Sequence, residues 1–287
     1  MSGLVIDFDK YLKRIPTHSV ELGQEAATPA SHYSRSANDA WSLLRYVERN
    51  LAKVNVYDSV YEPHMRRLST MVMLALVETF ERFLKEVAAV CVNHVGQVVL
   101  DDRLDAFSAR GSVAAAHFGS GDLGKALCES LTWCDCDDAN RRFRKILADP
   151  FQDDGKFFIF PNASQLPVGL RNRAELMRIV WQLRHTIAHN AGLVTSADAR
   201  KFGLLVKRQV HSPRLLEPTK GDVWYVKLFL DETVELINLA VAQRLSELLA
   251  TIYAANPSLF DAAVKAKDLA NLFGVPITIA GFTQQPR

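Results

Sequence analysis

Two histidines and an arginine stand close together in the stretch Arg184-His-Thr-Ile-Ala-His189-Asn190. Imidazole titrates near neutral pH, so His185 and His189 can each accept or donate a proton. The guanidinium of Arg184 offers a fixed fork of donors to phosphate oxygens and can stabilise charge that builds on phosphorus. Together these residue types suit RNA cleavage without a metal ion, in which the ribose 2′-hydroxyl loses its proton and attacks the adjacent phosphorus.

The residues around this set predict a helix over 171–190, with Gly192 placed where a carboxyl-terminal cap belongs. At about 100° per residue, Arg184 and His189 diverge by about 140°, so they are poorly placed to share one site within a single straight helix. They flank a second apolar stripe of the same helix, and a second copy packed on that stripe would bring two arginines and two histidines around one cleft. The predicted core stripe contains Leu176, Val180, Leu183 and Ile187, and the second stripe contains Ala174, Met177, Trp181 and Ala188.

The sequence around this helix is basic. Residues 171–210 contain eight Lys and Arg residues against two acidic residues, Glu175 and Asp198. A positive surface of this kind attracts the phosphate backbone of a nucleic acid. RNA is therefore the partner that this segment predicts.

The motif Arg184…His189-Asn190 at the end of a helix resembles the R-x4–6-H signature of the HEPN superfamily. An upstream segment, Leu74-Ala-Leu-Val-Glu78-Thr-Phe-Glu81-Arg-Phe-Leu84, is similar to the family's earlier core helix, which often carries an acidic residue. The resemblance covers about 120 residues, over 60–95 and 170–255.

The resemblance implies an α-helical domain that dimerises through the motif helix and a metal-independent endoribonuclease without a cofactor, often a bacterial toxin or antiviral effector. Arg184 and His189 would be its catalytic pair, and His185 and Asn190 would support them. Glu78 would take the acidic position, for which Glu81 is an equal alternative. A separate antitoxin or regulatory partner is a further expectation from this class of protein.

Whole-chain properties set the limits of this interpretation. The chain has 287 residues, 48% hydrophobic residues and a net charge of +2, which excludes a disordered chain and a globally basic nucleic-acid coat. The longest apolar run, over 71–77, is far shorter than the roughly 20 residues that span a bilayer. With acidic residues and no basic, apolar leader at the amino terminus, we expect a cytoplasmic protein that does not enter membranes.

The pattern along the chain predicts a mainly α fold, a HEPN-like helical bundle with a small β-hairpin between the motif helix and the carboxyl-terminal helix. We expect an amino-terminal arm over 1–35, a helical domain over 36–256 with an acidic insertion over about 97–168, and a helix and tail over 257–287. Within these, we expect a long central helix over 59–96, short helices near 123–133 and 138–148, and a short extended segment over 157–160. Strands are predicted over 204–210 and 223–230, followed by a helix capped by Asp231, and a last helix near 259–272 precedes a loose tail.

Three weaker patterns remain open. His185 and His189 are spaced like the two histidines of a zinc helix, but Thr186 replaces the expected glutamate and no third ligand is evident. Gly119-Ser-Gly121-Asp-Leu-Gly124 matches a dinucleotide-binding pattern without a preceding strand, and Cys128, Cys134 and Cys136 do not have zinc-site spacing. A catalytically silent RNA-binding or partner-binding module of the same fold is the main alternative function.

Overall fold

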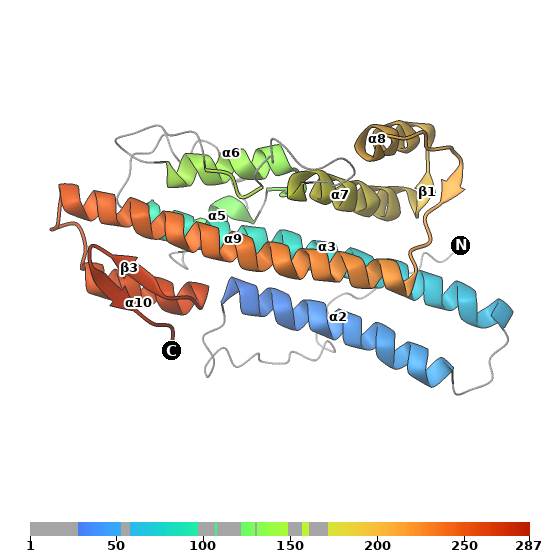
Figure 1. Ribbon diagram of the computed structural model, residues 1–287, viewed down its shortest axis with the longest axis horizontal. Helices are drawn as coiled ribbons and strands as arrows, with labels where there is room; N and C mark the ends of the chain where they lie inside the picture. Colours follow the sequence, from blue (N-terminus) through green and yellow to red (C-terminus); the bar gives the residue numbers. More distant parts are fainter. Residues whose placement is uncertain are drawn as a thin grey trace, which may run out of the picture.

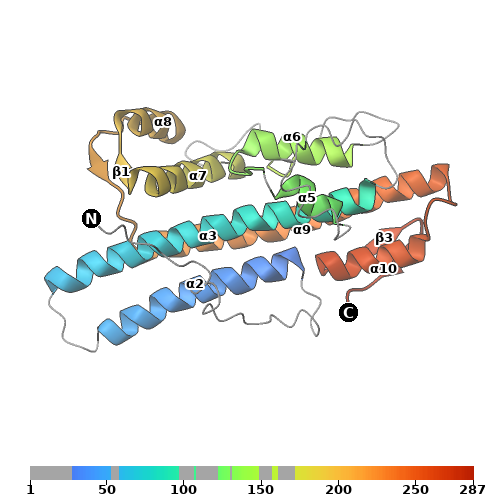
Figure 2. The same cartoon turned by 180° about the vertical axis from the view of Figure 1, so that it is seen from behind.

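Two long helices, α3 and α9, run side by side in the same direction through the middle of the protein (Figure 1). The computed structural model describes residues 28–52, 58–96, 107, 122–129, 131–148, 157–160 and 172–287. One layer on the central pair contains α2 and α10, and the opposite layer contains the short α5 together with α6, α7 and α8 (Figure 2). The helix bounds are α2 Pro29–Leu51, α3 Asp58–Val95, α5 Leu123–Cys128, α6 Cys136–Leu147, α7 Arg173–Asn190, α8 Ser196–Val206, α9 Lys220–Ala255 and α10 Ala262–Phe273.

The mainly helical prediction is confirmed, and α3 and α7 begin and end within two residues of their predicted limits. The apolar side chains that recur at helical spacing along α3 are all buried, and its aromatic rings contact both neighbouring layers; they are Val77, Phe80, Phe83, Leu84, Val87 and Cys91. Phe80 packs against Tyr33 of α2 and against Phe160, whose ring meets Trp181 of α7 edge-on at 5.7 Å. The central helix therefore ties α2 and α7 into one core.

The predicted strands over 204–210 and 223–230 are wrong. The side chains of Thr195 and Thr219 each accept a hydrogen bond from the backbone N–H three residues later. The carboxylates of Asp198 and Asp222 in turn accept from the backbone N–H of those threonines, so one capping box starts α8 and another starts α9. The aromatic and β-branched residues that favour a strand over 223–230 lie on a helix, because burial at helical spacing overrides strand propensity. Asp231 is consequently not a cap; it lies inside α9 and accepts hydrogen bonds from Tyr33 and Lys227.

A small β element does lie between the motif helix and α9, but it encloses α8. Strand β1 (Leu193–Val194) pairs antiparallel with β2 (Arg214–Leu215), so the chain between them forms a closed lobe. Gly192 has φ +84°, and a Cβ there would meet the carbonyl oxygen of Leu216 at 3.2 Å. The lobe has its own small core, made of Val194, Ala199 and Phe202.

The shorter elements depart from prediction in their limits. Helix α2 begins at Pro29, seven residues before the predicted start at Ser36, and α5 ends at Cys128 instead of continuing to 133. In place of a loose tail, β3 (Ile277–Ile279) and β4 (Phe282–Gln284) form a hairpin that packs on α10. Residues 157–160 form no strand, although Ile159 and Phe160 are buried. Residues 8–15, whose sequence favours a short helix within the amino-terminal arm, lie outside the described residues. No helix of the described ranges is long and apolar enough to cross a membrane.

Gly124 permits the close approach of α5 to α3. A Cβ at this position would lie 2.2 Å from the carbonyl oxygen of Ala89 and 2.7 Å from its Cα. We therefore expect Gly124→Ala to push α5 off α3 and to lower the free energy of unfolding by about 1–3 kcal/mol. Urea unfolding followed by circular dichroism measures the change.

The matched control is Gly221→Ala, in the first turn of α9. A Cβ there comes no closer than 3.6 Å to its nearest neighbour, the hydroxyl of Thr219, and alanine is the better helix former. Its stability should equal or exceed that of the wild type. Equal stabilities of the two variants would show that α5 does not depend on this approach.

Candidate active site

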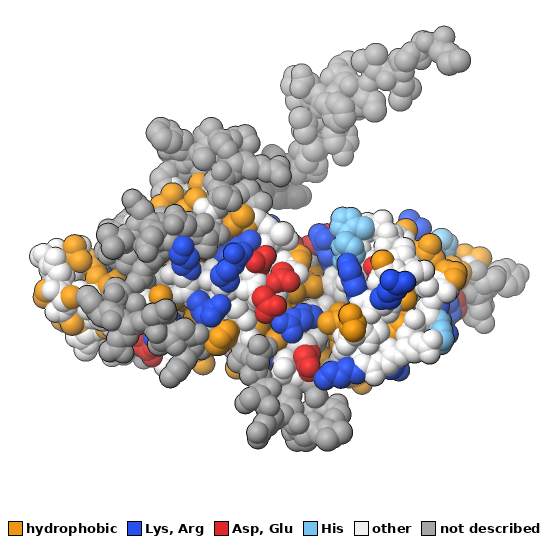
Figure 3. Space-filling view, turned by 90° about the horizontal axis from the view of Figure 1, so that it is seen from above, with side chains coloured by type: hydrophobic (Ala, Val, Ile, Leu, Met, Phe, Trp, Pro, Cys, Tyr) orange, Lys and Arg blue, Asp and Glu red, His pale blue; other side chains and the backbone are white. Residues whose placement is uncertain are grey.

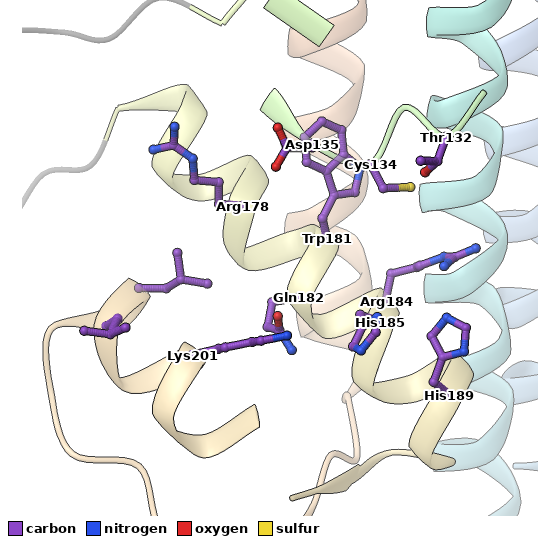
Figure 4. Close-up of a pocket in the computed structure, with 12 residues that line it drawn as sticks. Thr132, Cys134, Asp135, Arg178, Trp181, Gln182, Arg184, His185, His189 and Lys201 are labelled. Carbon is purple, nitrogen blue, oxygen red and sulfur yellow. The ribbon is translucent and has the colours of Figure 1, made fainter. Parts of the chain in front are cut away.

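A pocket of about 530 Å³ lies between α7, α8 and the segment over 132–135 that leads into α6 (Figure 4). Its volume is within the range of small-molecule sites and accommodates about one nucleotide. Two consecutive helices and one segment about forty residues before them in the sequence build its walls. The described residues that line it are Thr132, Cys134, Asp135, Arg178, Trp181, Gln182, Arg184, His185, His189, Lys201, Leu204 and Leu205.

Helix α7 supplies the histidines from one face. At about 100° per residue, Arg178, Gln182, His185 and His189 fall within an arc of about 60°, so the pocket follows this stripe along the helix. The rings of His185 and His189 lie with their centroids 4.7 Å apart, and both residues are exposed. Two proton carriers therefore stand side by side at one site.

Arg184 reaches the same pocket from the neighbouring face of α7. Its side chain extends toward α3 beneath the 132–135 segment, on the side of α7 where the ring of His189 also lies (Figure 4). Although Arg184 and His189 diverge around the helix axis and were expected to be poorly placed to share one site, both line this pocket. The Nε of Arg184 is buried without a hydrogen-bond partner among the described residues, as is Nε1 of Trp181. Such unpaired donors are rare in folded proteins and need a ligand, water or catalytic role to explain them.

Most of the stripe predicted to pack on a second copy is buried against this chain's own core. Ala174, Met177 and Trp181 are buried against the central core, whereas Ala188 is exposed. The hydrophobic period correctly indicates a buried face but does not tell which partner buries it. Leu176, expected in the core, is 37% exposed. Dimerisation through α7 stays a prediction, and these three side chains do not support it.

Glu81 of α3 holds the 132–135 wall in place. Its carboxylate accepts hydrogen bonds from the backbone N–H of Trp133 (3.0 Å) and the thiol of Cys134 (3.1 Å), and it pairs with Lys85 (3.4 Å). Burial raises the pKa of Glu81, but these bonds and the charge of Lys85 outweigh burial and leave the pKa below its usual range. The same contacts act oppositely on the thiol: burial first, then the charge of Glu81 and the hydrogen bond to it, raise the pKa of Cys134 to about 12. Cys134 is thus protonated at neutral pH and unsuited to nucleophilic attack.

Glu78 and Glu81 have different surroundings. Glu78 is exposed, and the structure describes no hydrogen bond or ion pair for it, whereas the side chain of Glu81 is 13% exposed. Neither carboxylate contacts Arg184 or His189 through a described hydrogen bond. Of the two acids, Glu81 is the one connected to the pocket, through Trp133 and Cys134.

We expect Glu81→Ala to lower the free energy of unfolding by about 1–3 kcal/mol, because it leaves the buried N–H of Trp133 without an acceptor. The exposed neighbour supplies the control: Glu78→Ala should change stability by less than about 0.5 kcal/mol. Urea unfolding of both variants gives the comparison. Equal effects would show that Glu81 does not support the wall.

Asn190 has a structural position. Its side-chain amide donates to Asp198 of α8 at 2.8 Å, and it is not among the described lining residues. Asp198 also accepts from Gln182 (3.0 Å) and from the hydroxyl of Thr195 (2.8 Å). Burial raises the pKa of Asp198, but these hydrogen bonds outweigh it and hold the pKa below its usual range. Asp198 thereby fastens α8, and with it one wall of the pocket, to α7.

The lining carries more positive than negative charge. Arg178, Arg184 and Lys201 face it, against Asp135 among the described lining residues. Both oxygens of Asp137 accept from Arg178, at 3.0 and 3.1 Å, and Asp135 caps α6 by accepting from two backbone N–H groups. Asp135 and Arg178 are therefore each engaged elsewhere, whereas no ion pair is described for Arg184 or Lys201. An anion is the ligand that this balance favours.

Sequence reasoning missed the contributions of α8 and of the 132–135 segment. Lys201, Leu204 and Leu205 belong to a helix whose signal, the Thr195…Asp198 capping box, was present in the sequence. Nothing local to Thr132 or Cys134 points to α7, since their contacts depend on long-range packing.

The described residues offer no group of three or more His, Cys, Asp or Glu side chains that could hold a metal ion. All four cysteines are free thiols. Of the glycine pattern over 119–124, residues 119–121 lie outside the described residues, and Gly124 belongs to α5.

Comparison of the chain with protein-family models, with curated proteins and with solved structures returns no match. The similarity to the HEPN superfamily therefore rests on the motif and on the upstream helix segment of the sequence, and it stays a prediction.

Proposed function

We propose that the protein is a metal-independent endoribonuclease of HEPN type and that its active site is the pocket between α7 and α8. The observation that carries this proposal is the meeting of Arg184, His185 and His189 in one positively charged pocket of nucleotide size. Neutral-pH proton carriers beside a phosphate-binding cation are the groups that RNA transesterification uses.

In this mechanism one imidazole removes the proton of the ribose 2′-hydroxyl. The 2′-oxygen forms a bond to phosphorus, the bond from phosphorus to the 5′-oxygen breaks, and a protonated imidazole gives its proton to that leaving oxygen. The products are a 2′,3′-cyclic phosphate and a 5′-hydroxyl, and no water is consumed. We assign the essential proton transfer to His189, with His185 beside it as the supporting group.

Arg184 binds the scissile phosphate and stabilises the charge that builds on its oxygens. Its buried Nε has no hydrogen-bond partner among the described residues, and a bound phosphate would supply the acceptor that this side chain lacks. In the wider proposal from the resemblance, the enzyme is a cytoplasmic toxin or antiviral effector. It would act as a homodimer and be restrained by an antitoxin or regulatory partner.

The test is cleavage of an end-labelled RNA in excess EDTA by wild type and by Arg184→Ala, with analysis of the product ends. We expect wild type to yield cyclic phosphate and 5′-hydroxyl ends, and Arg184→Ala to cleave about 10²–10³-fold more slowly. Arg45→Ala, an exposed position on α2, serves as the matched control and should cleave like wild type.

Three results would overturn the proposal: 5′-phosphate ends, a requirement for added Mg²⁺ or Zn²⁺, or no cleavage of RNA by wild type. RNA binding without cleavage would instead identify a catalytically silent module of the same fold.

A further inference from the structure

The lobe closed by β1 and β2 carries exposed positive side chains, of which Lys201 lines the pocket and Arg200 lines a second hollow of the lobe. Residues 191–216 include five exposed Lys and Arg side chains and one acidic residue, Asp198, which is buried and hydrogen-bonded. One of the five, Lys207, pairs with Glu175 at 3.4 Å; no ion pair is described for the others, which are Arg200, Lys201, Arg208 and Arg214. Figure 3 looks onto this layer and shows histidine side chains beside Lys and Arg side chains.

The face of α8 that lines the pocket carries both charged and apolar side chains. Lys201, Leu204 and Leu205 lie within an arc of about 100° and together form the wall opposite the α7 stripe. Leu204 is 81% exposed, so an apolar side chain stands open at the rim beside a cation. That pairing fits a nucleotide, whose base packs on apolar surface while its phosphate takes the charge.

Charge indicates the direction in which a strand longer than one nucleotide leaves the pocket. On the α6 side, the exposed Asp137 and Asp138 lie in the first turn of the helix, and Asp135 lines the pocket. Asp137 and Asp138 are paired with Arg178 and Arg141, so the charges of that side are largely compensated. No ion pair is described for Arg200, Lys201 and Arg208 of the α8 surface, which therefore attracts phosphate more strongly. The path over α8 is thus the favourable one.

We propose that the α8 lobe is a docking platform for single-stranded RNA, with Lys201, Arg200 and Arg208 on its phosphates and Leu204 against a base. The inference rests on the proposed function, whose substrate class it narrows to unpaired strands. The bases of an unpaired strand can be splayed onto an apolar side chain such as Leu204, whereas the bases of a duplex stay stacked and paired.

Binding is measured by fluorescence anisotropy with a single-stranded 2′-O-methyl RNA, which lacks the attacking hydroxyl and stays intact, at several salt concentrations. We expect Arg200→Gln with Arg208→Gln to weaken binding by about tenfold and to reduce the slope of log K against log salt by about 1.4, as for two lost phosphate contacts. Leu204→Ala should weaken binding equally at every salt concentration, because its contact is not ionic.

The matched control is Arg45→Gln with Arg49→Gln, an equal charge loss on α2 in the opposite layer, and it should bind like wild type. Four results would overturn the platform: no binding by wild type, equal binding of the same probe in a duplex, an unchanged salt slope in the α8 variant, or an equal loss in the α2 control. If wild type cleaves RNA and the α8 variant binds RNA as tightly as wild type, the proposed function stands and the platform is rejected. If the α8 variant binds RNA more weakly but wild type does not cleave RNA, the platform stands and the proposed function is rejected.

Discussion

His189→Ala should lower the rate of RNA cleavage by about 10²–10⁴-fold, the usual contribution of a positioned acid or base. The imidazole lines the pocket and lies in the last turn of α7, beside the ring of His185. The affinity for a non-cleavable RNA should change far less than the rate, because Arg184 and Lys201 keep their places. Single-turnover cleavage and anisotropy on the same protein preparation separate the two effects.

The control for this variant is His211→Ala, which removes an exposed histidine of the α8 lobe that does not line the pocket. It should cleave at nearly the wild-type rate. If His189→Ala and His211→Ala cleave equally well, the activity belongs to another site or to a contaminant, and the assignment of His189 is wrong.

Asp198→Ala should lower the free energy of unfolding by about 2–4 kcal/mol, the largest stability loss that we expect from one substitution in the pocket region. It removes hydrogen bonds to a buried charged acceptor from Gln182, Asn190 and Thr195, and with them the capping box of α8. Helix α8 would then lose its anchor to α7. Urea unfolding measures the loss, and RNA affinity should fall with it.

Asp222→Ala is the matched control, because Asp222 completes the same capping box at the start of α9 but is exposed and bonds to no second helix in the described structure. It should cost about 1 kcal/mol or less. An equal cost for the two variants would show that the bonds from α7 to Asp198 contribute nothing.

The lowered pKa of Asp198 also predicts how the stability of wild type depends on pH, compared with that of Asp198→Asn. Its stabilisation is complete above the unfolded-state pKa near 3.9 and is lost as the pH falls through the lower pKa of the folded state. Below about pH 4 the stability of wild type should therefore fall more steeply than that of Asp198→Asn. Parallel curves would contradict a charged Asp198 in the folded protein.

Long helices could be predicted from the sequence because their burial follows a period of 3.6 residues. The α3 and α7 limits are confirmed on that signal. The error at α8 and the start of α9 has a physical cause: Val223, Trp224 and Tyr225 have strand propensity, whereas the capping boxes at Thr195 and Thr219 carry the helix signal. Capping geometry was the better guide at these two helix starts.

The site could be predicted in part. Arg184, His185 and His189 were identified together, and the structure brings them into one pocket. Periodicity could not show that Met177 and Trp181 are buried by the chain's own core, since a stripe does not name the surface that covers it. Nor could it place Glu81 beneath the wall at Cys134, a contact between residues 53 positions apart.

The most direct test of the central claim uses an RNA with one 2′-deoxy nucleotide at the mapped cleavage position. If the 2′-oxygen is the nucleophile, purified wild type in EDTA should bind this RNA as it binds the all-ribose strand and should not cut it at that position. Cleavage at the deoxy position would mean that water or another group attacks the phosphorus, and the mechanism built on Arg184 and His189 would be wrong.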